Sequence, residues 1–131
     1  PADLEIGFVA SPDVVTRVGA EPGMRVVRTL PDGNVLLVAP RYRAFTELVQ
    51  RLAAAGIDIV EIAGNRAILM TAIVRDGPIP TVPGVDELFS MPLDARPGFR
   101  RVAYQVDVAH LADALRGFEG AGVDVEHLYD Y

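Results

Sequence analysis

The C-terminal end of the sequence carries its densest cluster of side chains suited to acid–base chemistry. His127, Tyr129 and Tyr131 occupy alternate positions, so an extended strand would place all three on one face. Glu126 precedes the histidine, and a histidine with a nearby carboxylate can act as a general base. His127 is therefore the candidate catalytic residue, and His127 and Tyr129 are candidate ligand-binding residues. The competing interpretation is a partly exposed amphipathic strand with no chemical role.

A second cluster lies near the middle of the chain, where Arg41, Tyr42 and Arg43 open a predicted helix. The N–H groups and the dipole at a helix N-terminus favour anions. Two arginines are unfavourable for the helix in that position, and an anionic ligand would relieve the conflict. Guanidinium groups also form forked hydrogen bonds to carboxylates and phosphates. We therefore expect a small anionic ligand at these three residues; the alternative is that the arginines extend into solvent or pair with carboxylates such as Glu47.

The composition excludes several kinds of chemistry. The chain has no cysteine and two histidines, which excludes disulfides and thiolate nucleophiles and disfavours zinc and iron–sulfur sites. We expect no metal and no cofactor. The net charge of −6 opposes nucleic acid as a partner, because phosphate contacts need an excess of basic residues. No apolar run reaches the roughly 18–20 residues of a membrane helix and no secretory leader is recognisable, so we expect a cytoplasmic protein without a membrane partner.

The elements that carry both clusters repeat along the chain. The segment Ala55-Gly56-Ile57-Asp58-Ile59 reappears as Ala121-Gly122-Val123-Asp124-Val125. A helix with one apolar stripe precedes each copy, formed by Phe45, Leu48, Val49 and Leu52 and by Leu111, Ala114, Leu115 and Phe118. An apolar run typical of a strand precedes each helix. The sequence therefore predicts two β-α-β units, within residues 34–62 and 100–128.

Two β-α-β units in tandem favour a ferredoxin-like α+β fold, in which one antiparallel sheet carries both helices on one face. We expect residues 1–131 to form a single compact domain with pseudo-symmetric halves, 1–65 and 66–131. Turn residues 63–66 predict a hairpin between strands 57–62 and 67–74. The proline-rich segment 76–98 is expected to be a surface connection, with a single helical turn at Val85–Phe89. The sheet face without helices predicts a homodimer, with Tyr129 or Tyr131 near the contact.

The stretch Val102–Tyr131 resembles the first half of an ACT domain, through its helix 111–118 and its ending Ala121-Gly122-Val123-Asp124-Val125. ACT domains are small ferredoxin-like regulatory modules that commonly bind amino acids, often at dimer or tandem-domain interfaces. The resemblance implies a regulatory domain that binds an amino acid or an organic anion and acts through dimerisation.

Two other classes of function stay open at this point. One is a small cofactor-free enzyme, such as an isomerase or lyase, that uses His127 or the two arginines 41 and 43. Pro1 belongs to this alternative, because an N-terminal proline next to a β-α-β unit resembles the tautomerases, whose proline amine is the catalytic base. The other is a purely structural oligomerisation module. We favour ligand binding over catalysis because no established catalytic motif is present.

Overall fold

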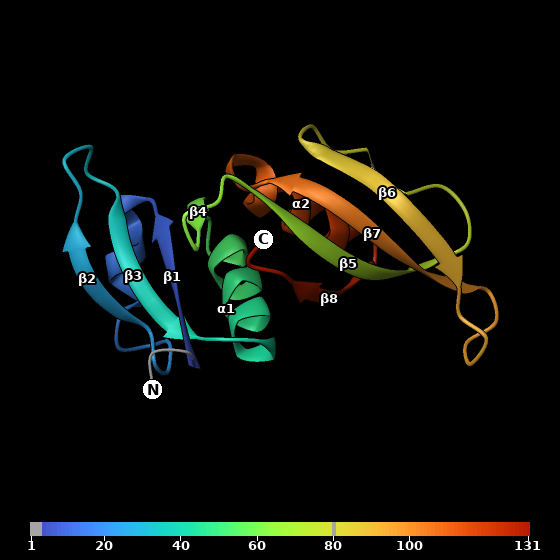
Figure 1. Ribbon diagram of the computed structural model, residues 1–131, viewed down its shortest axis with the longest axis horizontal. Helices are drawn as coiled ribbons and strands as arrows, with labels where there is room; N and C mark the ends of the chain where they lie inside the picture. The colour runs from blue at the N-terminus through green and yellow to red at the C-terminus, as the bar shows by residue number, and fades with distance from the viewer. Residues whose placement is uncertain (1–3, 80) are drawn as a thin grey trace.

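The computed structural model describes residues 4–79 and 81–131, and within them the fold is α+β with two four-stranded antiparallel sheets (Figure 1). The first sheet has the strand order β2-β3-β1-β4 and the second has the order β6-β7-β5-β8. The strands of the first sheet are β1 (Glu5–Ala10), β2 (Arg25–Thr29), β3 (Val35–Pro40) and β4 (Ile59–Ile62). Those of the second are β5 (Ala67–Arg75), β6 (Val85–Pro92), β7 (Phe99–Asp107) and β8 (Asp124–Leu128).

Each half of the chain adds helical segments to its sheet. The first half has the 3-10 helix η2 (Pro12–Arg17) and the helix α1 (Arg43–Ala54). The second has the 3-10 helix η3 (Val108–His110) and the helix α2 (Leu111–Gly120). All eight residues of the two predicted apolar stripes are buried, because each stripe of an amphipathic helix faces the core.

The sequence predicted a single sheet that carries both helices. The structure has two sheets instead. The predicted hairpin at residues 63–66 is also wrong, since β4 pairs with β1 whereas β5 pairs with β7 and β8. Ala63 and Gly64 both have positive φ, 50° and 80°, and this tight reversal passes the chain from the first sheet to the second. A turn sequence determines a local reversal but not the partner of the strand that follows.

The two sheets share one arrangement of strands. In each, the first strand of the half lies between the third and the fourth. An irregularity in the pairing interrupts β2 between Val26 and Arg28 and interrupts β6 between Glu87 and Phe89. A second pairing irregularity occurs in each half, between β1 and β4 after Val9 and between β5 and β8 after Thr71.

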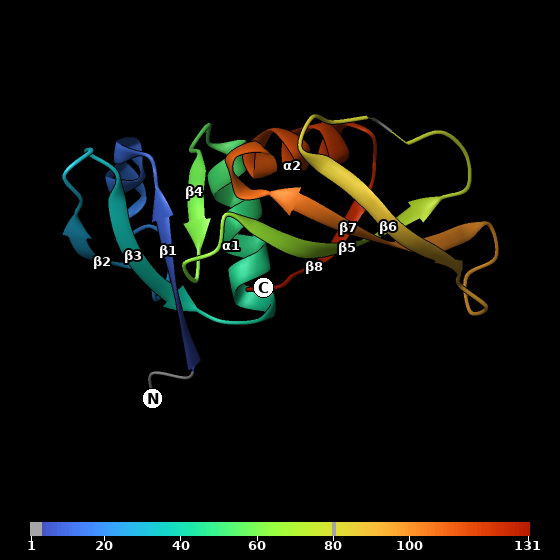
Figure 2. The ribbon, with the colours of Figure 1, turned by 45° about the horizontal axis from the view of Figure 1, so that its top comes forward.

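The helices fill the space between the sheets. Figures 1 and 2 show α1 between the first sheet and β8 of the second, and α1 also contacts α2. Phe8 and Phe45 meet edge to face at 5.5 Å in the first half, and Tyr104 lies 5.5 Å from Phe118 in the second. Both pairs belong to one continuous cluster of buried residues that extends across the two halves.

Three arginines of the helical segments tie the layers together through hydrogen bonds. Arg116 of α2 donates from Nε to the carbonyl oxygen of Ala53, in the last turn of α1, at 2.7 Å. Glu21 is 4% exposed and accepts hydrogen bonds from Arg17 of η2 at 3.0 Å and from Arg51 of α1 at 2.8 Å. Burial raises the pKa of Glu21, but the bonds from Arg51 and Arg17 outweigh it and hold the pKa below its ordinary value.

The segment expected to be a surface connection contains the strand β6 instead of a helical turn at Val85–Phe89. β6 lies at the edge of the second sheet and pairs with β7 alone. Almost all of its side chains are exposed, so the positions of its apolar residues do not indicate which face is buried. No helix among residues 4–79 and 81–131 is long and apolar enough to cross a membrane.

Candidate functional site

A pocket of about 420 Å³ lies where the two halves of the chain meet. We call it the junction pocket. Four of the five predicted ligand-binding residues line it, namely Arg41 and Tyr42 from the first half and His127 and Tyr129 from the second. The remaining lining residues are Ile6, Phe45, Leu128, Asp130 and Tyr131. Residues that are far apart in the sequence therefore contribute to one cavity.

The turn between β3 and α1 determines how Arg41 and Tyr42 reach this pocket. Only Arg41 and Tyr42 lie between β3 and α1, whereas the 3-10 helix η3 lies between β7 and α2 in the second half. This short connection has Tyr42 at φ 67° and ψ −135°, a region that residues with a side chain adopt at a cost. Tyr42 is 64% exposed, so no burial of its ring compensates for this backbone.

An ion pair between the halves crosses the junction pocket. Arg41 Nη2 lies 2.6 Å from Asp130 Oδ2, and both side chains are about 30% exposed. The backbone on each side is held as well: the N–H of Arg41 donates to the carbonyl oxygen of Leu4 at 3.0 Å, and Asn65 Nδ2 donates to that of Asp130 at 2.6 Å. The pocket thus presents one guanidinium and one carboxylate at fixed positions.

Aromatic rings of the C-terminal residues line the same pocket. The rings of His127 and Tyr129 meet edge to face at 4.2 Å, and those of Tyr129 and Tyr131 are 5.4 Å apart. Beyond the end of β8, backbone hydrogen bonds continue to hold the chain on β5, from Tyr129 N–H to Leu69 O at 2.9 Å and from Leu69 N–H to Tyr131 O at 2.8 Å. Hydrogen bonds to β5 therefore hold the backbone that carries Tyr129 and Tyr131.

Arg43 does not line the junction pocket. Its guanidinium is 81% exposed and lies 3.6 Å from Glu47, one turn further along α1. This contact is the carboxylate pairing that was the alternative to anion binding at residues 41–43. The structure therefore separates Arg41, at the pocket, from Arg43, on the outer surface of the helix.

Among the described residues, the contacts include no hydrogen bond or ion pair between His127 and a carboxylate, although the charge of His127 acts on the neighbouring Glu126. The neighbouring Glu126 accepts two hydrogen bonds from Arg101, at 2.8 and 2.7 Å. These bonds outweigh the effect of burial and hold the pKa of Glu126 below its ordinary value. Asp130 is engaged by Arg41. Pro1, the other candidate base, lies outside the described residues.

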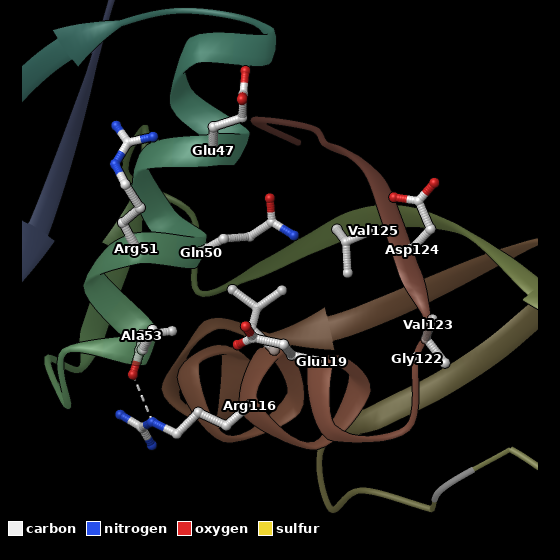
Figure 3. Close-up of a pocket in the computed structure, with 12 residues that line it drawn as sticks. Glu47, Gln50, Arg51, Ala53, Arg116, Glu119, Gly122, Val123, Asp124 and Val125 are labelled. Carbon is white, nitrogen blue, oxygen red and sulfur yellow. Dashed lines mark hydrogen bonds between the residues drawn. The ribbon is translucent and has the colours of Figure 1, made fainter.

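A larger pocket of about 540 Å³ lies between the C-terminal ends of α1 and α2 and the chain that leads into β8 (Figure 3). Two arginines line it, and both are engaged in ion pairs within the fold, Arg51 with Glu21 and Arg116 with Asp113. Arg116 also donates a hydrogen bond to the carbonyl oxygen of Ala53. No aromatic side chain is among its described lining residues. We therefore place the candidate site at the smaller junction pocket, which has aromatic rings together with both charges.

Sequence reasoning missed Asp130 as a member of the site. Alternation along residues 126–131 sets Asp130 on the face opposite His127, Tyr129 and Tyr131, so the cluster expected on one face of the strand did not include it. The signal available in the sequence was the run of polar and aromatic side chains at 126–131, which marked the segment without assigning a partner for each residue.

Among the described residues, no group of three or more histidine, aspartate or glutamate side chains is arranged to hold a metal ion. Comparisons with protein-family models, curated proteins and solved structures give no match to this chain. The fold and the site define an α+β protein with two antiparallel sheets and a charged, aromatic pocket at their junction.

Proposed function

We propose that the protein is a small regulatory domain that binds an amino acid in the junction pocket. The observation that carries this proposal is the pair Arg41–Asp130, which presents a cation and an anion 2.6 Å apart beside aromatic rings. A zwitterion inserted between them would bring its carboxylate to the guanidinium and its ammonium group to the carboxylate. Both protein charges would then stay paired, and the ligand would meet no unpaired charge.

The aromatic lining supports a ligand with an apolar or aromatic body. Rings bury apolar surface and also attract a cation over their faces, so His127, Tyr129 and Tyr131 suit both the ammonium group and the side chain of an amino acid. A pocket of about 420 Å³ falls within the range common for small-molecule sites. Among amino acids we favour phenylalanine or tyrosine, and an organic anion without an ammonium group should bind more weakly because it leaves Asp130 without its partner.

The common strand order of the two sheets, with pairing irregularities at corresponding places, supports an internal duplication. A ligand site at the junction of two related halves is also what the resemblance to ACT domains implies. A cytoplasmic location stays part of the proposal.

Dimerisation is the second part of the proposal, and the outer face of the second sheet supports it. Leu88, Phe89 and Met91 of β6 are 52%, 53% and 47% exposed. The irregularity between Glu87 and Phe89 leaves Leu88 and Phe89 on the same face, because a bulge interrupts the alternation. Tyr131 lies on this face too, in a shallow hollow shared with Leu88. A contiguous apolar patch of this kind is typical of an interaction surface.

Charge favours a second copy as the partner. On this face the N-terminal end of β6 carries the acidic Asp86, whereas at the other end Met91 pairs with Arg101 of β7, whose guanidinium also contacts Glu126. A two-fold contact with antiparallel strands would bring the acidic end of each copy to the basic end of the other. If the ligand part of the proposal failed and the dimer part held, the protein would be a structural oligomerisation module.

Calorimetric titration of the protein with phenylalanine tests the ligand proposal. We expect saturable binding, with at least about tenfold weaker affinity after Arg41→Ala, about 1.4 kcal/mol, and a comparable loss after Asp130→Asn. Phenylpropionate, which has the same carboxylate and ring but no ammonium group, should bind more weakly than phenylalanine.

Arg43→Ala is the matched control, since Arg43 is two residues from Arg41 but outside the pocket, and it should leave the affinity unchanged. Failure of the intact protein to bind any member of a panel of the twenty amino acids would refute the ligand proposal. Equal loss of affinity in Arg41→Ala and Arg43→Ala would move the site from the pocket to the helix N-terminus.

A further inference from the structure

A separate pocket of about 330 Å³ lies over the part of β6 and β7 that the chain between β5 and β6 covers. Three apolar side chains line it, Ile79 and Val82 from that connection and Val85 from β6. Its polar lining comes from Thr81 in the connection, from Glu87 on β6 and from Arg100 and Tyr104 on β7. We call it the β7 pocket. None of its lining residues belongs to the junction pocket.

The β7 pocket contains a buried hydroxyl that has no partner. Tyr104 is 5% exposed, and its hydroxyl makes no hydrogen bond with any of the described residues. Its ring is fixed against Phe118 of α2. Burial, together with the charge of Glu87, raises the pKa of Tyr104, so the hydroxyl keeps its proton and offers it as a donor. Buried hydroxyls in folded proteins nearly always have a partner, and this one therefore indicates a group that the chain itself does not supply.

Arg100 provides a second donor on the same face of β7, four positions before Tyr104. Its Nε is buried without a hydrogen-bond partner among the described residues and lies 3.9 Å from Asp76 Oδ1. Its terminal nitrogens make only long contacts, 3.4 Å to Ser90 Oγ and 3.5 Å to the carbonyl oxygen of Gly77. A guanidinium with weak partners next to an unpartnered hydroxyl donor is complementary to an anionic acceptor.

We propose that the β7 pocket binds a short aliphatic carboxylate, whose oxygens accept hydrogen bonds from Tyr104 and Arg100 while its body contacts Ile79, Val82 and Val85. Ile79 and Val82 line the pocket together with Tyr104, so their side chains would have to shift for the ligand to reach the buried hydroxyl. Glu87 determines which class of carboxylate binds best. Its charge would attract the ammonium group of an aliphatic amino acid, and it would repel a carboxylate that has no ammonium group.

Titration with three probes of similar shape tests this site: isovalerate, leucine and 4-methyl-2-oxopentanoate. We expect at least one to bind, with at least tenfold lower affinity in Tyr104→Phe, which removes the hydroxyl and keeps the ring. The variant should be no less stable than the parent without ligand, because the hydroxyl it loses has no partner there. Glu87→Gln should weaken leucine and strengthen the two probes that lack an ammonium group.

Arg41→Ala separates this site from the junction pocket. The affinity of isovalerate should be the same in Arg41→Ala and in the parent, whereas the affinity of phenylalanine should fall in Arg41→Ala and stay unchanged in Tyr104→Phe. Absence of binding for all three aliphatic probes would overturn the inference. So would an affinity for the best of them that Tyr104→Phe leaves unchanged, whatever the outcome at the junction pocket.

Discussion

At the scale of single residues, the backbone conformation of Tyr42 is an unusual local feature that lies at the candidate site. Its φ of 67° belongs to a region where a Cβ atom is unfavourable and glycine is not. Two residues, Arg41 and Tyr42, connect β3 to α1 in this conformation, whereas in the second half the three residues of the 3-10 helix η3 connect β7 to α2. The strained residue is also a wall of the junction pocket, where strain and function commonly coincide.

Replacement of Tyr42 by glycine should stabilise the fold by about 1 kcal/mol, because glycine adopts this backbone without the Cβ penalty. Chemical denaturation of Tyr42→Gly and Tyr42→Ala separates the effect of the backbone on stability from the effect of the ring. Both variants lose the ring, but only alanine keeps the Cβ atom. Alanine should be the less stable of the two. Equal stability of both variants would mean that the backbone at position 42 is not strained.

Glu21 gives a pH-dependent prediction at the same scale. The pKa of this carboxyl is lower in the folded chain than in the unfolded chain, so its contribution is fully present above the unfolded pKa and is lost as the pH falls through the folded pKa. Glu21→Gln should cost about 1–3 kcal/mol at pH 7. The difference between the parent and the variant should shrink progressively below about pH 4.

Denaturation curves at pH 7 and pH 3 measure this effect. Glu47→Gln is the control, because the pair of Glu47 with Arg43 is exposed and 3.6 Å long, and such pairs contribute little. A difference for Glu21→Gln that is as large at pH 3 as at pH 7 would contradict the ion pairs as its cause.

At the scale of elements, one buried hydrogen bond joins α1 to β8. The N–H of Leu128 donates to Thr46 Oγ1 at 3.1 Å, and both residues are buried. The bond fixes the start of α1 against the end of the last strand, and these are the two elements that form the junction pocket. The position of the pocket walls therefore depends on a contact that neither element contains by itself.

Thr46→Val keeps the shape of the side chain and removes the acceptor, so the buried N–H of Leu128 loses its partner. We expect a loss of about 1–3 kcal/mol in the free energy of unfolding, together with faster hydrogen exchange at Leu128. Thr46→Ser keeps the hydroxyl and should preserve most of the protection of that amide. An unchanged exchange rate in Thr46→Val would show that the bond does not hold β8.

At the scale of the whole molecule, each sheet has one edge strand with largely exposed side chains, β2 in the first sheet and β6 in the second. The most exposed apolar side chains of the second sheet are those of β6, and they face away from the helices. This distribution is the basis of the proposed homodimer, in which the outer face of the second sheet is covered by its copy.

Light scattering at high protein concentration should give twice the chain mass of 14.1 kDa for the parent and the single chain mass for Phe89→Arg. Val27→Arg is the matched control, since Val27 is 49% exposed and lies at the corresponding irregularity of β2 in the first sheet. It should remain dimeric. A monomeric parent would contradict the dimer, and dissociation by Val27→Arg alone would move the contact to the first sheet.

The sequence alone determined the elements whose signal is local. The stripes of α1 and α2 could be predicted because an amphipathic helix repeats its apolar residues within a few positions and buries them whatever the partner is. The strands β3, β4 and β5 could be predicted for a similar reason, as apolar runs between turn residues. Residues 85–92 could not, because an exposed edge strand with two prolines nearby shows neither alternation nor a continuous apolar run.

Only the tertiary structure decided which strands pair and which side chains meet. The turn at residues 63–66 reads as a hairpin, yet the strands on either side of it belong to different sheets, since pairing depends on surfaces that are distant in the chain. The candidate site shows the same limit. Arg41 and Tyr42 were marked by their place at a helix start and His127 and Tyr129 by their alternation, but the ion pair that unites them joins residues 89 positions apart. A local pattern carries no information about a contact of that range, because only the packing of the two halves brings its partners together.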